Sequence, residues 1–366
     1  MENKRERYLD VLRIVATCAV VMLHTITGTT DIHYAEVAEA RYPAYYMLID
    51  WCSWAVPVFL MMSGYLFLNP KREVPVKKMY LKHCMRILIA IFLFGVPFSL
   101  IEQIAGYHGF IWPMIPNALL AAALNRNWAH MWYLYAILVL YAITPLLRLI
   151  LPKIPKAVVY VFIAIVFVIT GVIPFIDAAF SVPIWCLHFL PVNYFTYYLC
   201  GYCFAISERK ATKGRVCLYG GLIVAVMAFE AVNRLVIIRS MGPGYDFPFT
   251  ALLAMLIFAF AKNVAGIIRG QADDAVKTAD AADSTAAGDT ETGKGAKVLT
   301  FFADLCFGIY LVHPVFLNFF YKFLDVSLYD YPFVPGLLMF FGLTLAGSVV
   351  LTILMRLIPP MRKYVL

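Results

Sequence analysis

Residues 7–24, RYLDVLRIVATCAVVMLH, decide the fold class, because they form an apolar run long enough to span a bilayer that nevertheless contains ionisable side chains. At 100° per residue, Asp10, Arg13 and His24 fall on one helix face about 60° wide, and Thr17 joins them. An ionisable side chain costs at least about 2.5–3.5 kcal/mol near the bilayer centre. The polar face therefore predicts a functional site within the membrane. The structural alternative is a buried Asp10–Arg13 ion pair and a histidine bonded to a neighbouring backbone.

The whole chain has the composition of a membrane protein. Its 366 residues are 63% hydrophobic and 14% charged, and the mean hydropathy is +0.79, whereas soluble domains contain about 25% charged residues. Many apolar runs reach the ~20 residues that cross a hydrocarbon core. We expect an all-α polytopic membrane protein. We assign the net charge of +8 to a cationic cytoplasmic face, not to nucleic-acid binding.

The chain contains about ten candidate membrane spans. They lie at approximately residues 8–28, 44–68, 79–103, 130–151, 156–174, 190–206, 215–238, 247–268, 298–321 and 334–358. If the N-terminus is cytoplasmic, the cytoplasmic segments include Lys71, Arg72, Lys77, Lys78, Arg209, Lys210, Arg362 and Lys363, whereas the opposite segments hold few basic residues, Arg41, Arg126, Arg239 and Lys322. Cytoplasmic loops of membrane proteins are enriched in Lys and Arg. The pattern predicts that both termini are cytoplasmic.

The segments between the spans indicate a single membrane domain over residues 1–366. Two long outward segments, 104–129 and 175–189, are aromatic and include Trp112, Trp128 and Trp185, which suits caps at the headgroup level. Residues 270–297 are rich in Ala, Asp, Thr and Gly without an apolar period. That composition predicts a disordered cytoplasmic linker between the eighth and ninth spans.

Three histidines are predicted at the outer side of the membrane. With Asp10 at the cytoplasmic interface, the helical rise places His24 about 21 Å along the first span and His313 about 22 Å along the ninth. His130 begins the fourth span at its outer end. Depth alone does not place the three in contact, and each has a structural alternative: His130 as an interfacial anchor, and His313 as a cap ahead of Pro314. The histidines and cysteines lack metal-ligand spacing, so we expect no metal site.

Basic residues gather at the opposite, cytoplasmic end of the spans. Arg13 lies one turn inside the first span, and Lys82 and Arg86, four residues apart, share a face of the third. Ser63 closes the second span at the same level, within Ser63-Gly64-Tyr65. Cations around a glycine-containing helix end predict a pocket for a phosphate-bearing ligand. The alternative is attraction of these side chains to lipid headgroups, which suits Lys82 better than the deeper Arg86.

An ordered series of motifs resembles acyltransferase family 3, a family of membrane-bound O-acyltransferases. The motifs are Arg7–Arg13 with Ala16, Val20 and His24; Phe59 with Ser63-Gly64-Tyr65-Leu66; Arg86-Ile87-Leu88; His130-Met131-Trp132-Tyr133-Leu134 with Tyr141 and Pro145-Leu146; Gly201-Tyr202; and Gly308-Ile309-Tyr310-Leu311-Val312-His313-Pro314. Each motif alone is weak, but their order along the chain is specific. The resemblance covers nearly the whole sequence except the 270–297 segment.

The resemblance implies an enzyme that takes an acyl group, usually acetyl, from cytoplasmic acyl-coenzyme A. It delivers that group to a hydroxyl of an extracytoplasmic glycan or lipid-linked sugar. The resemblance also implies a multi-pass protein of the cell membrane. The same membrane module also occurs fused to a racemase in glycopeptide-resistance proteins, where acyl transfer is not the evident task. We expect no such domain here, since no part of the 366 residues outside the membrane spans is long enough to form one.

The residues take specific roles in this scheme. His24 is the expected general base, since an imidazole suits proton transfer near neutral pH and a positioned base contributes ~10²–10⁴-fold. Covalent transfer through an acyl-histidine remains open as a second mechanism. The expected donor site consists of Arg13, Ser63, Lys82 and Arg86, Asp10 is expected to hold Arg13 in place, and His130, Trp132 and His313 are candidates for orienting the acyl group or the acceptor.

A proton-coupled transporter is the competing class, since buried ionisable residues are also typical of carriers. We find no internal repeat and no paired Gly- or Pro-broken spans, which argues against it. A non-catalytic membrane module would leave His24 and Arg86 unexplained. Glu230 and Arg234, four residues apart in the seventh span, have two interpretations: contact with a polar acceptor, or an ion pair within the helix.

Overall fold

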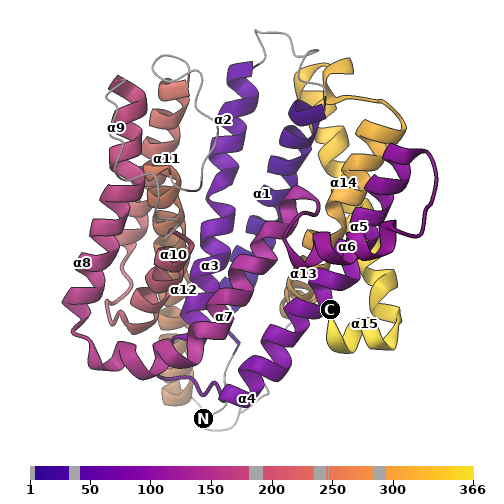
Figure 1. Cartoon of the computed structure of the whole chain (residues 1–366). Coiled ribbons are helices and arrows are strands. Elements are labelled where there is room, and N and C mark those ends of the chain that lie inside the picture. Colours follow the sequence, from indigo (N-terminus) through magenta and orange to yellow (C-terminus); the bar gives the residue numbers. More distant parts are fainter. Residues whose placement is uncertain (1–4, 33–41, 181–192, 235–244, 246, 283–293) are drawn as a thin grey trace.

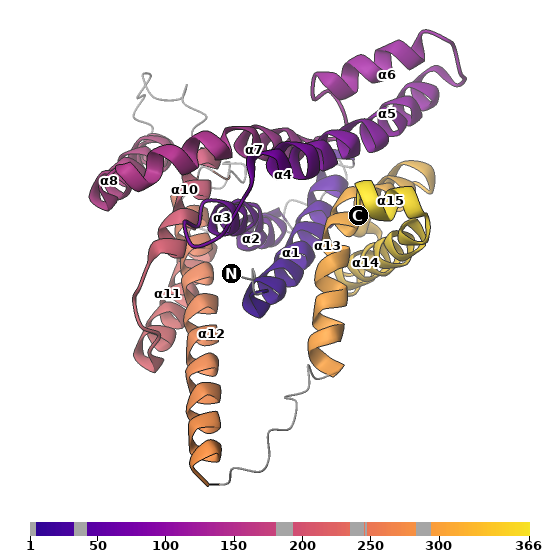
Figure 2. The same ribbon diagram turned by 90° about the horizontal axis from the view of Figure 1, so that it is seen from below.

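The computed structural model describes residues 5–32, 42–180, 193–234, 245, 247–282 and 294–366, and these residues form helices and no strand. Nine helical segments of this part of the chain are long and apolar enough to cross a membrane. The fold is therefore the all-α, multi-pass architecture expected from the hydropathy. Figures 1 and 2 show the helices gathered around α1 and α3. We call the end of the bundle at which α1 begins the lower end, as drawn in Figure 1, and the other the upper end.

The main helices follow one another along the chain. They are α1 (Arg7–Ile32), α2 (Tyr42–Ser53), α3 (Ala55–Phe67), α4 (Val76–Lys78), α5 (Met85–Tyr107), α6 (Met114–Ala123), α7 (Trp132–Ile150), α8 (Lys156–Phe167), α9 (Ile173–Phe180), α10 (Asn193–Ile206), α11 (Lys213–Val232), α12 (Pro248–Ala282), α13 (Lys294–Asn318), α14 (Phe333–Leu357) and α15 (Pro359–Tyr364). Turns of π-helix lie at Met79–Cys84, Val168–Val172 and Phe319–Phe323, and a 3-10 turn at Ala129–Met131 precedes α7.

The second predicted span is confirmed as one membrane-crossing segment, Pro43–Phe67, which consists of the two consecutive helices α2 and α3. The α-helix is interrupted at Trp54, between α2 and α3, and Pro57 lies in the first turn of α3. Proline is tolerated there because its missing N–H would have no partner within the helix. The sixth predicted span corresponds to α10, which has 14 residues. It is shorter than the other spans within the described part of the chain.

The predicted linker is partly helical. Helix α12 has 35 residues and continues to Ala282, and α13 begins at Lys294. Figure 2 shows the last turns of α12 extending beyond its neighbours. The expectation of irregular chain from residue 270 is therefore wrong for 270–282 and for 294–297, and residues 283–293 lie outside the described residues. Composition misled here because Ala is the best helix former even where no apolar face exists.

Glycine permits an unusually close helix pair in the core. A Cβ atom on Gly64 of α3 would lie 1.9 Å from the carbonyl oxygen of Tyr198 on α10, and one on Gly201 would lie 2.1 Å from the carbonyl oxygen of Met61. No side chain fits at either position, so the two backbones cross in direct contact. The pair supports one wall of the cavity described below, to which Met62 and Ser63 of α3 contribute.

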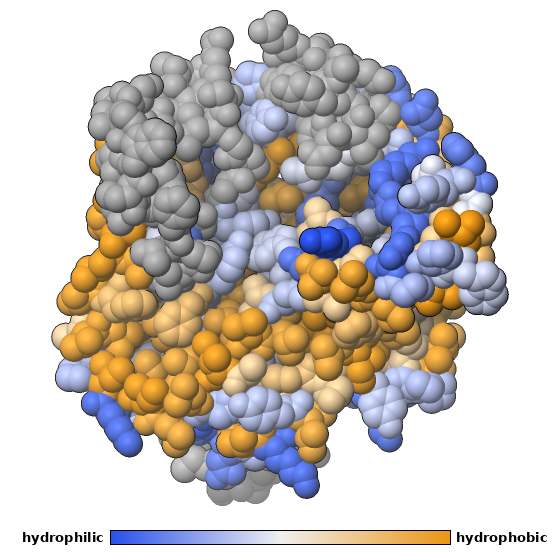
Figure 3. All heavy atoms as spheres, in the orientation of Figure 1, coloured by the Kyte–Doolittle hydropathy of each residue, from blue (hydrophilic) through white to orange (hydrophobic). Residues whose placement is uncertain are grey.

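Helix α1 lies at the centre and packs against α2, α3, α13 and α14. Helices α5 and α6 form a hairpin at the upper end, which accounts for most of the long segment 104–129. Figure 3 shows a broad hydrophobic band across the lower part of this face and more hydrophilic side chains around the upper end of α5. Of the tryptophans expected at the outer surface, Trp112 and Trp128 are described and Trp185 is not.

Candidate active site

Three histidines from distant parts of the chain meet at one place. His24 comes from α1, His130 from the 3-10 turn before α7, and His313 from α13. The ring centroids are 5.1 Å apart for His24 and His313, 5.5 Å for His130 and His313, and 6.5 Å for His24 and His130. The helical rise predicted their common depth, and the packing of α1 against α13 adds the lateral contact. We call these three residues the histidine cluster.

The backbone fixes the imidazole of His313. Its Nδ1 atom lies 2.8 Å from the carbonyl oxygen of Tyr310 and 3.2 Å from that of Ile309. Pro314 has no N–H for the Tyr310 carbonyl four residues earlier, so the histidine supplies the missing donor. Carbonyl oxygens only accept hydrogen bonds, so Nδ1 carries the proton and the Nε2 atom of the neutral ring is an acceptor. The predicted cap ahead of Pro314 is therefore present.

Two nitrogens of the cluster are available for a ligand. The Nε2 atoms of His130 and His313 are buried and have no hydrogen-bond partner among the described residues. The side chains of His130 and His313 are 3% and 0% exposed, whereas His24 is half-buried. Buried polar atoms are nearly always hydrogen-bonded in folded proteins. The cluster is therefore a place where a bound polar group completes the hydrogen bonding.

A cavity of about 490 Å³ lies below the histidine cluster, between α1, α3, α5, α7, α13 and α14. Its charged and polar lining includes Arg13, Ser63, His83, Arg86, Asp304 and Arg356, and its aromatic lining includes Phe59, Tyr133, Tyr141, Phe307 and Tyr310. Val20, one helical turn before His24, also lines it. The hydroxyl of Tyr310 donates to the backbone carbonyl of His130 at 2.6 Å. The cavity thus extends from a cationic end to the edge of the histidine cluster.

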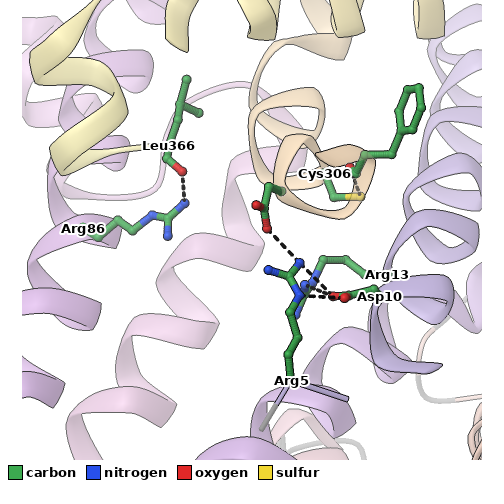
Figure 4. Close-up of polar contacts among 8 residues, drawn as sticks. Arg5, Asp10, Arg13, Arg86, Cys306 and Leu366 are labelled. Carbon is green, nitrogen blue, oxygen red and sulfur yellow. Dashed lines mark hydrogen bonds and ion pairs between the residues drawn. The ribbon is translucent and has the colours of Figure 1, made fainter. Parts of the chain in front are cut away.

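Arg13 is held as the sequence predicted. Its Nη1 atom donates to Asp10 at 3.1 Å, while Arg5 donates to both oxygens of the same carboxylate at 2.7 and 3.0 Å and also to Asp304 of α13 at 2.9 Å. Figure 4 shows Arg5 and Arg13 converging on Asp10. Hydrogen bonding to Asp10 raises the pKa of the Arg5 guanidinium above its ordinary value. Asp10 is therefore committed to two arginines and lies far from His24.

Two further arginines extend the cationic end of the cavity. Arg86 donates to the carbonyl oxygens of Val365 and Leu366 at 2.7 and 3.0 Å, as Figure 4 shows for Leu366, and its guanidinium lies 4.9 Å from the Phe307 ring. Arg356, in the last turn of α14, has a buried Nη1 atom without a hydrogen-bond partner in the described structure. Its uncommitted donor faces a cavity large enough for a ligand.

Lys82 does not join Arg86 in the lining of the cavity. Lys82 is exposed and does not line the cavity. It lies in the π-helical turn Met79–Cys84, in which each turn holds an extra residue. Lys82 is therefore not part of the arginine-lined end of the cavity. His83, the next residue, lines the cavity instead.

Trp132 does not reach the histidine cluster either. Its ring packs against Tyr194 of α10 and Tyr245, with centroids 4.9 and 5.3 Å away. Tyr133, the next residue, lines the cavity, and its ring centroid lies 5.7 Å from that of Tyr310. Within this motif the neighbouring residue Tyr133, and not Trp132, is the one that lines the cavity.

The polar pair predicted in the seventh span joins two helices. Arg234 forms two hydrogen bonds with the carboxylate of Asp50 on α2, one of them at 2.7 Å, and its guanidinium lies 5.5 Å from the Tyr46 ring. Both carboxylate oxygens of Glu230 are buried without a hydrogen-bond partner in the described residues. The ion pair therefore joins α2 to Arg234, two residues beyond the end of α11, instead of forming within the helix.

Sequence reasoning missed Arg356, Tyr133, Tyr310 and Asp50. Tyr310 lies inside a motif already identified, and Arg356 is a basic residue in the final turn of a span. Comparing the positions of polar residues along the spans could therefore have found both. Asp50 is itself an ionisable residue within a predicted span, which is a signal, but its partner Arg234 lies far away in the sequence. Within the described part of the chain, no group of three His, Cys, Asp or Glu residues is arranged to hold a metal ion.

Comparison with curated proteins and with solved structures gave no match. A family model described as an acyltransferase domain matches residues 6–353. That range includes the whole histidine cluster and every cavity-lining residue except Arg356 and Leu366. The chain therefore belongs to acyltransferase family 3 and is a multi-pass membrane acyltransferase.

Proposed function

We propose that the protein transfers an acetyl group from cytoplasmic acetyl-coenzyme A to a hydroxyl of an extracytoplasmic glycan or lipid-linked sugar. The single observation that carries this proposal is the cavity of about 490 Å³ with arginines at one end and the histidine cluster beside the other. Its volume lies within the ~300–1,000 Å³ range of small-molecule sites. Membership of the family establishes acyl transfer. The arrangement of the cavity suggests which end takes the acyl donor and at which end the acyl group is transferred.

The lower end of the cavity suits the nucleotide of coenzyme A. Arg13, Arg86 and Arg356 line it, and guanidinium groups bind phosphate through paired, charge-assisted hydrogen bonds. Ser63 lies beside Tyr141 at 3.4 Å between their hydroxyls and adds a polar group at the same wall. The excess of Lys and Arg in the segments at this end supports a cytoplasmic orientation, where coenzyme A is available.

The upper part of the cavity suits the acyl-bearing arm. Tyr133, Phe59 and Tyr310 give it an aromatic lining, along which the methyl and methylene groups of the extended arm can pack while the tyrosine hydroxyls are available to its amides. From Arg13 to His24 the helical rise is about 17 Å. An arm of that reach brings the thioester carbonyl from the arginines to the histidine cluster, in the outer half of the membrane.

In the proposed reaction His24 acts as general base. Its imidazole removes the proton of the acceptor hydroxyl, and the oxygen attacks the thioester carbonyl. The C–O bond forms and the C–S bond breaks, and the imidazolium returns the proton to the departing thiolate, so that the products are an O-acetyl ester and free coenzyme A. The unprotonated Nε2 of His313 and the free Nε2 of His130 accept hydrogen bonds from acceptor hydroxyls and orient them toward the carbonyl.

A His24→Ala variant tests the proposal in cells and with purified protein in lipid nanodiscs. We expect acetyl esters of the envelope glycans to disappear, with the rate of transfer lowered ~10²–10⁴-fold, while the protein accumulates normally and still binds coenzyme A. Val15→Ala is the matched control, since Val15 is exposed on the same helix and does not line the cavity. Unchanged acetylation in His24→Ala would reject His24 as the base.

Labelling with radioactive acetyl-coenzyme A distinguishes direct transfer from transfer through an acyl-histidine. Direct transfer leaves no label on the protein after incubation with radioactive acetyl-coenzyme A in the absence of acceptor. Label that withstands denaturation in the wild type and is absent from His24→Ala would instead establish a covalent intermediate on that residue.

A further inference from the structure

A second cavity, of about 650 Å³, opens at the upper end of the protein on the α5–α6 hairpin. Its lining includes Ser99, Glu102, Gln103, Asn117, Arg126 and Trp128. Figure 3 shows hydrophilic side chains around the upper end of α5, where the hairpin lies in Figure 1. We call this cavity the hairpin groove. It is separate from the cavity with the arginines and shares no lining residue with it.

The hairpin groove adjoins the histidine cluster through two aromatic rings. Trp128 stacks on Phe98 with ring centroids 4.0 Å apart and an angle of 9° between the ring planes. The centroids of Trp128 and Phe98 lie 6.4 and 5.8 Å from that of His130. A ligand in contact with Trp128 is therefore separated from His130 by no more than one side chain.

Hydrogen bonds hold the walls of the groove in place. The indole N–H of Trp128 donates to Glu102 at 2.8 Å, and the ammonium of Lys322, in the π-helical turn after α13, donates to the same oxygen at 2.6 Å. The amide of Gln103 donates to Ser99 and to the carbonyl of Met114 on α6. Trp128 is therefore fixed by a stacked ring and a directed hydrogen bond, unlike a tryptophan that only anchors the protein at the headgroups.

The groove retains polar groups for a ligand. The side chains of Asn117 and Arg126 make no hydrogen bond within the described residues. The side-chain oxygen of Asn127 is buried without a partner there, while its NH₂ group donates to Tyr135 at 3.1 Å. Amide, guanidinium and carboxylate groups beside an aromatic face provide both donors and acceptors for hydroxyl groups. This combination suits a carbohydrate better than a hydrocarbon chain.

We propose that the hairpin groove is the acceptor site, in which a sugar unit packs against Trp128 and is hydrogen-bonded by Asn117, Arg126 and Asn127. One of its hydroxyls then extends past His130 toward His24 and the thioester carbonyl. The donor and the acceptor thus reach the histidine cluster from two separate cavities. This assignment rests on the proposed acetyl transfer to a sugar.

The test uses the double variant Asn117→Ala/Arg126→Ala in the full-length protein. Both side chains are exposed and make no hydrogen bond to other described residues, so we expect the variant to keep the fold. Leu119→Ala is the control because Leu119 is exposed on α6, the helix that carries Asn117, and does not line the groove. Two quantities are measured: acetyl esters in isolated envelope glycans from cells, and the dissociation constant of coenzyme A for each purified protein in nanodiscs.

We expect the double variant to lower the protein-dependent acetyl esters at least tenfold while the dissociation constant of coenzyme A changes less than twofold. The Leu119→Ala control keeps both at the wild-type level. Wild-type ester levels in the double variant would overturn the acceptor assignment, as would a loss of esters accompanied by a loss of coenzyme A binding. Wild-type cells without protein-dependent acetyl esters would instead reject the acetyl transfer itself, and the acceptor site with it.

Discussion

The imidazole rings of His24 and His313 lie 5.1 Å apart, although one residue belongs to the first helix of the chain and the other to α13, close to its end. Neither the part of the chain before residue 283 nor the part after residue 293 therefore contains the candidate site alone. Helices α1 and α13 pack directly on each other. The site is formed where the beginning and the end of the chain meet.

His313 donates a hydrogen bond to the Tyr310 carbonyl and is proposed to orient the acceptor. We expect that substitutions can separate its effect on stability from its effect on activity. A His313→Ala change leaves the Tyr310 carbonyl without a donor, and an unsatisfied buried acceptor costs about 1–3 kcal/mol. Adding Pro314→Ala restores a backbone N–H for that carbonyl. We expect the double variant to regain much of the lost thermal stability but not the transfer activity. Recovery of both, measured by thermal unfolding and acetyl transfer, would show that His313 acts only through the backbone.

The cationic end of the cavity predicts different effects for three basic residues. Replacing Arg356 or Arg86 by Ala removes a hydrogen-bonding cation, worth about 1.5–3 kcal/mol, so we expect coenzyme A to bind at least tenfold more weakly. Lys82→Ala leaves that affinity unchanged, since its side chain is exposed outside the cavity. Calorimetric titration with coenzyme A checks all three. A Lys82 effect as large as that of Arg356 would contradict the arrangement.

The ion pair between Asp50 and Arg234 predicts a stability effect with a rescue. Removing one partner of a buried pair, as in Asp50→Ala, leaves an uncompensated charge and costs about 3–5 kcal/mol. The double change Asp50→Leu/Arg234→Leu removes both charges, and we expect it to be closer in stability to the wild type than either single Leu variant. Thermal unfolding in detergent measures this. A double variant as unstable as the sum of the singles would argue against direct pairing.

The contact between α3 and α10 predicts that Gly64→Ala prevents folding. The added Cβ would lie 1.9 Å from a backbone oxygen, and neither backbone can yield without separating the helices. Gly342 on α14 has open space around its Cβ position and is the matched control. We expect normal accumulation of Gly342→Ala in membranes and almost none of Gly64→Ala. Equal amounts of the two on an immunoblot would contradict the close packing.

The fold class and the depth of the histidines followed from the sequence because both depend on quantities internal to one helix. Hydropathy gives the span, and the rise per residue gives the position of His24 along it. The Asp10–Arg13 pair followed for the same reason. Sequence spacing was not enough for Lys82, since a separation of four residues puts two side chains near one helix face but does not tell which of them lines a cavity.

Contacts between helices were beyond sequence reasoning. The pairing of Arg234 with Asp50, the turn of Trp132 toward Tyr194 and Tyr245, and the approach of His130 to His24 all depend on how helices cross. Side-chain periodicity gives the polar face of a helix, but it does not give the helix that covers that face. The helical continuation of α12 to Ala282 was missed because helix propensity was set aside where no apolar period existed.

Arg5 bonds to Asp10 on α1 and to Asp304 on α13, the two helices that contribute His24 and His313. A helix is stiff along its axis. A contact that joins two helices at one end therefore also restrains how far they slide past each other at the other end. Sliding one helix past the other by a single turn, about 5.4 Å, would move the two imidazoles by more than their present spacing. The Arg5 ion pairs therefore join α1 and α13 near one end of the bundle, and the His24–His313 contact joins the same two helices nearer the other.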